Sequence, residues 1–173
     1  MPASWRSRSR RKASRLPSFL WALAILIGTA LGAPAFAQDQ PPRTLEAEPP
    51  LAAAPDPGPA ASAAIATLID GQWHAFLADD GPAAFAAASP QLQAIYQRPT
   101  NFLAMVAAEY GVIYRARSLA PGAFVSWNGY LARRVAVTGP QGEPVTALYL
   151  LTPLADGSWR IAGCLLFRPA LES

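Results

Sequence analysis

The chain has 173 residues and a formal net charge of +3, and this charge is unevenly distributed along it. Six of the 14 basic residues lie between Arg6 and Arg15, whereas the part from Gln38 onward has 8 Arg against 11 acidic residues, a net charge of −3. Because nucleic-acid binding needs a basic surface, this distribution argues against a nucleic-acid partner for the part after residue 37.

The first 37 residues have the pattern of a secretory signal peptide. A basic stretch precedes an uncharged apolar run over 16–33, and the small residues of Ala35–Ala37 form a cleavage signal before Gln38. The alternative is an uncleaved membrane anchor, because the run approaches the ~20 residues that span a bilayer; Pro17 and Gly28 interrupt it. We expect cleavage after Ala37, a periplasmic or secreted location, and no stable membrane anchor after cleavage.

The remainder divides into a linker and a domain. Residues 38–61 are mostly Pro, Ala, Asp and Glu, a composition that cannot bury enough apolar surface to offset ordering entropy, so we expect disorder there. Residues 62–173 have the length of a single domain. Cys164 is the only cysteine, which excludes an internal disulfide and a Cys/His zinc site, and its apolar neighbours predict a buried, unreactive thiol. We expect no metal and no cofactor.

The first half of the domain shows helical periodicity. Apolar residues at three- and four-residue spacing predict a first helix from about Ser62 that carries Ile65, Ile69, Trp73 and Phe76 on one face. Three more helices are predicted from residues able to cap a helix start, which are Asp80 before Pro82, Ser89 before Pro90, and Thr100 or Asn101.

The second half shows strand-like runs separated by Gly- and Pro-containing turns. The predicted strands are 112–119, 124–127, 130–138, 145–152 and 159–167. Helices followed by hairpin-linked strands predict an α+β domain with an antiparallel sheet.

Both faces of the last predicted strand are largely apolar. An antiparallel sheet with one wet face alternates cleanly between apolar and polar residues, so we expect the second face to be covered. The candidates for this face are Arg134, Leu148, Leu150, Ala162, Cys164 and Leu166. We prefer a homodimer through this face as the cover, and linker 38–61 is the alternative.

Five stretches in this order resemble the bacterial domain-of-unknown-function family 4864, and the resemblance extends over nearly all of 62–168. They are AFLADD (75–80), AAASPQLQAIY (86–96), FLAMVAAEY (102–110), VIYRA (112–116) and DGSWRIAGCLL (156–166). That family is similar to the cone-shaped, cystatin-like α+β fold of nuclear transport factor two and of its SnoaL-type polyketide-cyclase and ketosteroid-isomerase relatives. The chain departs from the family pattern at Gly111 and Ala116.

The resemblance implies N-terminal helices packed on a curved antiparallel sheet, with a pocket between the two layers. The family has no established activity, so the resemblance implies a fold but no catalytic residues. The aromatic and apolar residues that we expect to line such a pocket are Trp73, Phe76, Tyr96, Met105, Tyr110 and Tyr149.

Three polar pairs are candidates for chemistry. His74 follows Asp70 by one helical turn, which would suit proton transfer in an isomerase- or cyclase-like enzyme, but on a solvated helix edge the same spacing is an ordinary surface contact. Asp79 and Asp80 could form a carboxylate pair or a metal site, although adjacent acids at a helix end are usually a solvated cap. Arg133 and its neighbour Arg134 could bind an anion, but neighbours on a strand point to opposite faces.

The function that we expect from the sequence is therefore binding rather than catalysis. The predicted protein is an exported, non-enzymatic binding module for a small apolar molecule or a protein partner. The alternative is an isomerase- or cyclase-like enzyme that uses Asp70 and His74.

Overall fold

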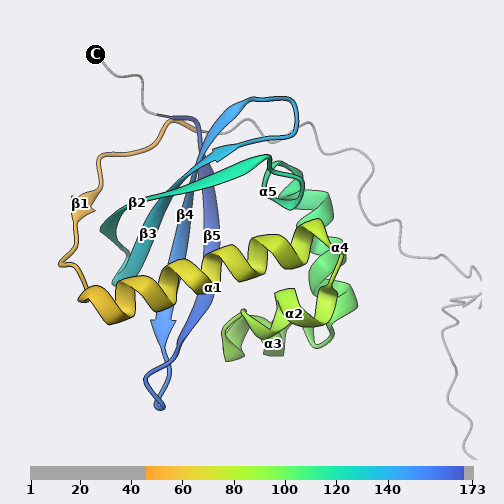
Figure 1. The fold of residues 1–173 in the computed structure, drawn as a ribbon, viewed down its shortest axis with the longest axis horizontal. Helices are drawn as coiled ribbons and strands as arrows, with labels where there is room; N and C mark the ends of the chain where they lie inside the picture. The colour runs from red at the N-terminus through yellow and green to blue at the C-terminus, as the bar shows by residue number, and fades with distance from the viewer. Residues whose placement is uncertain (1–45, 170–173) are drawn as a thin grey trace, which may run out of the picture. The chain divides into compact units, whose positions relative to one another are not determined.

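The computed structural model describes residues 46–169, which form an α+β unit with helices first and strands after. Figure 1 shows α1 (Pro59–Leu77) lying across the sheet, with the other helices gathered beside its C-terminal half. The predicted fold class is therefore confirmed. The helices are α1 Pro59–Leu77, α2 Gly81–Ala86, α3 Pro90–Tyr96, α4 Pro99–Glu109 and α5 Gly111–Tyr114. The strands are β1 Ala52–Ala53, β2 Ser118–Trp127, β3 Tyr130–Thr138, β4 Pro144–Pro153 and β5 Trp159–Phe167.

Two of the predicted helix starts are confirmed. The Asp80 carboxylate accepts a hydrogen bond from the Ala83 backbone N–H at 2.9 Å, and the Ser89 hydroxyl accepts one from the Leu92 backbone N–H at 3.3 Å. Each side chain satisfies a donor that a helix start leaves without an intrahelical partner. In both helices a proline occupies the first turn, where its missing N–H costs nothing.

The other two helix starts differ from the prediction by a few residues. α1 begins at Pro59 instead of Ser62, after Gly58, whose φ of 97° suits glycine. α4 begins at Pro99, so the prediction of Thr100 or Asn101 as its cap was wrong. Pro99 supplies the preset φ of a first helical turn, and the Asn101 side chain instead donates to the Tyr96 carbonyl at 3.0 Å.

The first predicted strand, 112–119, was wrong over most of its length. Residues 111–114 form the short helix α5, and β2 begins only at Ser118. The β-branched and aromatic residues there favour a strand locally, but tertiary contacts override this preference. Ile113 is buried in the core, and Tyr114 and Arg115 bind the end of α1, contacts that a straight strand would not provide together.

The sheet is an open antiparallel meander with the order β1-β2-β3-β4-β5. The bounds of β3 and β5 agree with the prediction, and β4 is longer by one residue at each end. The separate strand predicted at 124–127 is the end of β2, because the pairing continues through Pro121-Gly122 with a bulge between Pro121 and Phe124. A bulge accommodates proline and glycine that a regular central strand would exclude.

A second bulge changes which residues of β5 share a face. Leu150 pairs with Gly163 but Leu151 pairs with Ile161, so Ala162 is the additional residue. Since one extra residue reverses the alternation beyond it, Cys164 and Leu166 lie on the helix side. The prediction was therefore wrong for Cys164 and Leu166 on the second face, whereas Leu148 and Leu150 do belong there.

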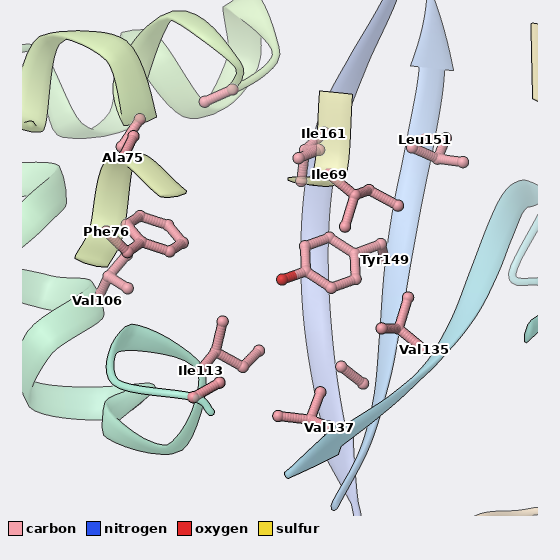
Figure 2. Close-up of a cluster of buried hydrophobic side chains, with 14 of the residues drawn as sticks. Ile69, Ala75, Phe76, Val106, Ile113, Val135, Val137, Tyr149, Leu151 and Ile161 are labelled. Atoms are coloured by element: carbon pink, nitrogen blue, oxygen red, sulfur yellow. The ribbon is translucent and has the colours of Figure 1, made fainter. Parts of the chain in front are cut away.

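The main core fills the space between the helices and the sheet. α1 contributes Ile65, Ile69 and Phe76, and β4 contributes Tyr149 and other inward-facing residues. Figure 2 shows these side chains projecting from both layers toward the same interior. Trp73 and Trp159 are partly buried against this core. Burial of this apolar surface is the main driving force that holds the helices on the sheet.

The second sheet face has a smaller apolar cluster, and the segment before α1 lies against it. The cluster consists of Val125, Ala132, Leu148 and Phe167, with Leu51, Trp127, Leu150 and Leu165 partly buried against it. Ala47 forms an isolated bridge to Arg168 beyond β5, and Ala52–Ala53 pairs with β2. Segment 46–53, which we call the strap, therefore contacts both edges of the sheet.

The strap is fixed by an ion pair between a buried Glu48 and a half-buried Arg134. Glu48 Oε1 lies 2.6 Å from Arg134 Nε, and Arg134 NH2 donates to Glu48 Oε2 at 2.6 Å. The Glu48 side chain is only 5% exposed, and the two parallel contacts are the strong form of an Arg–carboxylate pair. Disorder was expected over 38–61, but 46–61 contains a strand, an ion pair and the start of α1. The sequence pattern could not indicate Arg134 as a partner 86 residues away.

The described part of the chain contains no helix that is long and apolar enough to cross a membrane. The apolar run over 16–33 and the predicted cleavage position lie outside the described residues.

Candidate functional site

A cavity between the helices and the sheet is the best candidate for a functional site. Its volume is about 90 Å³. Its lining is mostly aromatic and aliphatic and comes from α1, α3, α4, α5, β4 and β5. The lining residues are Gln72, Phe76, Leu92, Tyr96, Phe102, Met105, Val106, Tyr110, Ile113, Tyr149, Ile161, Gly163 and Cys164.

The structure brings five of the six predicted pocket residues together around this cavity. They are Phe76, Tyr96, Met105, Tyr110 and Tyr149. Trp73 is not in the lining; it packs at the margin of the core, next to the ring of His74. Trp73 and Phe76 are only three residues apart on α1, but Trp73 lies beside the core whereas Phe76 lines the cavity.

Several lining residues were missed although some carried a usable signal. Phe102 and Val106 share helical spacing with Met105 and Tyr110, so one face of α4 could have been identified as a whole. Phe102 contacts the rings of both Phe85 and Tyr96, which places α3 beside α4.

Most polar groups at the cavity are already hydrogen-bonded within the protein. The Tyr110 hydroxyl donates to the Cys164 carbonyl at 3.1 Å, and Gln72 Nε2 donates to the Ala84 carbonyl at 3.2 Å. Tyr149 differs, because its hydroxyl is buried and has no hydrogen-bond partner among the described residues. Figure 2 shows this hydroxyl pointing from β4 toward the side of Phe76 and Val106.

The two cavity residues whose pKa values shift are both held neutral. Burial raises the pKa of the Tyr149 hydroxyl well above 10, and the neighbouring Cys164 adds to the effect. Burial also raises the pKa of the Cys164 thiol to about 12, which agrees with the predicted unreactive thiol, since the thiolate is the nucleophile. Tyr149 and Cys164 are cross-strand partners in β4 and β5.

Asp70 and His74, the candidates for proton transfer, lie on the solvent side of α1 and not in the cavity. Their closest side-chain atoms are 3.3 Å apart, and the side chains are 63% and 61% exposed. His74 Nδ1 also lies 2.9 Å from the Asp70 carbonyl oxygen. The contact is therefore an ordinary surface pair, which was the alternative given for this spacing on a solvated helix edge.

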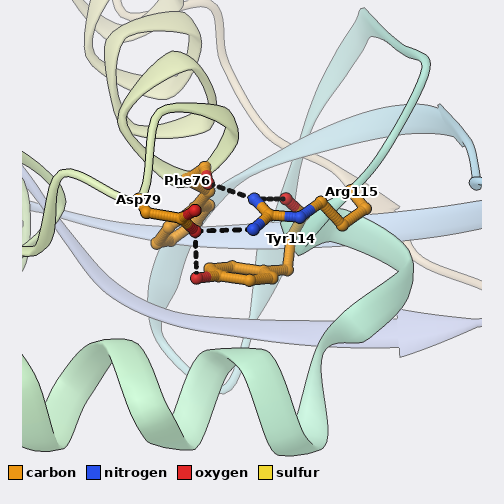
Figure 3. A network of polar contacts seen from close by, with 4 residues as sticks. All are labelled: Phe76, Asp79, Tyr114 and Arg115. Carbon is orange, nitrogen blue, oxygen red and sulfur yellow. Dashed lines mark hydrogen bonds and ion pairs between the residues drawn. The ribbon is translucent and has the colours of Figure 1, made fainter.

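Asp79 and Asp80 have separate structural roles. Asp80 caps α2, whereas Asp79 accepts hydrogen bonds from the Tyr114 hydroxyl at 2.5 Å and from Arg115 NH2 at 2.6 Å (Figure 3). These two donors lower the pKa of the Asp79 carboxyl. Arg115 NH1 also donates to the Phe76 carbonyl at 2.6 Å, which satisfies an acceptor near the end of α1. Over 46–169 there is no group of three His, Cys, Asp or Glu that could hold a metal ion.

Arg133 and Arg134 point to opposite faces of β3, so they do not form one anion site. Arg133 NH1 donates to Ser62 Oγ at 3.1 Å, and its guanidinium lies 4.3 Å from the centre of the Phe124 ring. Arg134 pairs with Glu48 on the second face. A wider, more open hollow of about 290 Å³ adjoins Arg133, but small side chains form much of its lining and Asp56 places a carboxylate there.

The comparison with known protein families places this chain. A family described as "Domain of unknown function (DUF4864)" matches residues 59–172, which include all five helices and strands β2 to β5. The chain belongs to this family. No similar protein was found among curated sequences, and no similar chain was found among solved structures. Membership of the DUF4864 family leaves the biochemical role unassigned, and the likeness to nuclear transport factor two stays an expectation.

Proposed function

We propose that this DUF4864 chain is an exported binding module that takes up a small apolar molecule between its helices and its sheet. The cavity carries the proposal: its lining is predominantly aromatic and aliphatic and comes from both layers of the fold. Concave sites with apolar walls and a few placed polar groups are typical of small-molecule binding. The expected cone-shaped fold, in which a curved sheet leaves a pocket beside the helices, is part of the same proposal.

The chemistry of the cavity favours binding over proton transfer. Among the described residues, its lining contains no carboxylate, imidazole or guanidinium, and its Tyr149 and Cys164 have raised pKa values. A general acid or base works best with a pKa near the operating pH, and neither group meets this condition. Asp70 and His74 are exposed on the far side of α1, away from the space that a bound molecule would occupy.

Binding is tested with toluene, a small probe that is apolar like the cavity walls. We expect NMR signals of residues that line the cavity, such as Val106 and Ile113, to shift in a saturable titration with toluene. Cys164→Leu places a larger side chain in the cavity and is expected to abolish these shifts. Ile95→Leu, at a position 67% exposed on the outside of α3, is the matched control and is expected to leave the titration unchanged.

Two outcomes would contradict binding in this cavity. One is the absence of saturable shifts in the parent protein. The other is a set of shifts that is the same in Cys164→Leu as in the parent.

Export is a separate part of the proposal and rests on the signal-peptide pattern of residues 1–37. Intact-mass measurement of the protein recovered outside the cytoplasm is expected to give the mass of residues 38–173. Recovery of the full chain of 173 residues in that fraction would contradict cleavage after Ala37.

A further inference from the structure

The Tyr149 hydroxyl is the polar group that the protein fold leaves unexplained at this cavity. Its side chain is 1% exposed, yet its oxygen has no hydrogen-bond partner among residues 46–169. A buried polar group without a partner destabilises the folded state, and most buried side-chain polar atoms in proteins are paired. The unpaired hydroxyl therefore indicates that its partner is a molecule that enters the cavity from outside the chain.

The surroundings of Tyr149 define the chemistry of that partner. The raised pKa keeps the hydroxyl protonated at neutral pH, so it can donate one hydrogen bond. Over residues 46–169, no positively charged side chain lines the cavity to compensate a buried anion. The partner should therefore be neutral, carry an acceptor oxygen, and be apolar elsewhere to match the walls.

Among the described residues, Tyr149 has the buried hydroxyl at the cavity that is left for this role; Tyr96 also lines the cavity but is only partly buried, and its hydroxyl is not one of the buried atoms without a partner. The Tyr110 hydroxyl is engaged by the Cys164 carbonyl, and the Gln72 amide nitrogen is engaged by the Ala84 carbonyl. The Cys164 Sγ is 3.9 Å from the Leu165 carbonyl and, as a thiol, is at best a weak donor. A ligand oxygen would thus find a strong, buried and uncommitted donor at Tyr149.

We propose that the cavity recognises a small neutral carbonyl compound, whose oxygen accepts a hydrogen bond from the Tyr149 hydroxyl while its hydrocarbon part contacts the apolar walls. This inference rests on the proposed function, because it names the class of molecule that the same cavity would bind. The cavity volume of about 90 Å³ limits this compound to a small molecule.

A pair of probes of nearly equal shape tests this inference. Cyclohexanone carries the acceptor oxygen, and methylenecyclohexane has a CH₂ group in its place. Dissociation constants of both probes are measured by NMR titration for the parent, for Tyr149→Phe, and for Tyr114→Phe as the control. Tyr114 is a suitable control because its hydroxyl binds Asp79 and it does not line the cavity.

We expect Tyr149→Phe to weaken cyclohexanone binding about tenfold relative to methylenecyclohexane, the effect of losing one hydrogen bond. Tyr114→Phe should leave the ratio of the two constants as in the parent. Because the ratio of the two dissociation constants is compared between variants, the different free energy of taking each probe out of water cancels. An unchanged ratio in Tyr149→Phe would overturn the carbonyl inference while leaving apolar binding intact. Failure of both probes to bind the parent would instead overturn the proposed function.

A second measurement does not depend on the variant. The infrared carbonyl stretch of cyclohexanone bound to the parent is expected at lower frequency than in hexane, because the hydrogen bond weakens the C=O bond. A bound carbonyl band at the hexane position would overturn the inference even if Tyr149→Phe does not fold. The same result would favour an ordered water as the partner of the Tyr149 hydroxyl.

Discussion

At the scale of single residues, Asp79 shows how one carboxylate joins two helices. It lies just after α1 with a φ of 55°, a conformation that Asp and Asn tolerate better than most residues. Its carboxylate receives Tyr114 and Arg115 from α5 and the residue after it, and the Arg115 guanidinium stacks 4.1 Å from the centre of the Tyr114 ring. The cluster therefore fixes the end of α1 to the entry of the sheet.

This cluster makes stability depend on pH in a defined direction. The pKa of Asp79 is lowered from 3.8, chiefly by the Tyr114 hydrogen bond and then by Arg115, so the folded state favours the ionised form. The stabilisation is present above about pH 4 and is lost as the pH falls through the lowered pKa. We expect the difference in unfolding free energy between the parent and Asp79→Asn to shrink from about pH 4 downward, in denaturant titrations at several pH values.

A companion variant separates the causes of the lowered pKa. Tyr114→Phe removes the largest contribution and should move the pKa of Asp79 back toward 3.8, as followed by NMR of the carboxyl carbon. A pKa of Asp79 that is the same in Tyr114→Phe and in the parent would contradict the assigned role of the hydroxyl.

At the scale of elements, the strap is held to the second sheet face by the Glu48–Arg134 pair. Arg134→Met keeps the apolar stem but leaves the Glu48 carboxylate buried without its counter-charge, which is a costly arrangement. We expect the strap to detach while the main core stays folded. The Ala54 amide donates to the Phe124 carbonyl at 3.1 Å, and the alternation of an antiparallel pair gives Ala52 the next bonded amide. Hydrogen exchange of these two amides should accelerate about tenfold or more, corresponding to a loss of about 1–3 kcal/mol.

Arg117→Met is the matched control for this experiment. Arg117 is an exposed arginine just before β2, outside the strap contacts. Its replacement should leave exchange of the Ala52 and Ala54 amides unchanged. Equal exchange of these amides in the parent and in Arg134→Met would show that the ion pair does not hold the strap.

At the scale of the whole described unit, the strap provides a cover for the second face. The large apolar residues that remain exposed over 46–169 are Leu77, Ile95 and Tyr130, and none belongs to the second-face cluster. Linker 38–61 was the alternative cover expected from the sequence, and its strap contacts this face of the same chain. Pairing of two copies through the same face, the cover preferred from the sequence, is the alternative that removal of the strap tests.

Removal of residues 38–57 tests the two covers against each other. Without the strap, Val125, Leu148 and Phe167 lose Leu51 and the neighbouring backbone as a cover, and an exposed apolar patch favours association. We expect the shortened protein to dimerise or lose solubility at micromolar concentration, as measured by light scattering after size exclusion, while the chain with the strap stays monomeric. A dimer of the same mass with and without the strap would instead support the homodimer, and a soluble monomer in both cases would contradict this role of the strap.

The sequence by itself determined the features that depend on neighbouring residues. The caps at Asp80 and Ser89, the bounds of β3 and β5, and the α+β order follow from local spacing and turn chemistry, and these predictions were confirmed. Five residues around the cavity were also named in advance, on the basis of a family resemblance and their aromatic or apolar character.

Only the tertiary structure decided the features that depend on partners far away in the chain. The extra residue at Ala162 reverses the faces of Cys164 and Leu166, and no local pattern signals where a strand pair gains a residue. α5 replaces a predicted strand because Ile113 and its neighbours gain contacts with distant helices. The strap is ordered by a partner 86 residues away, and the unpaired Tyr149 hydroxyl becomes evident only when all the groups around it are in place.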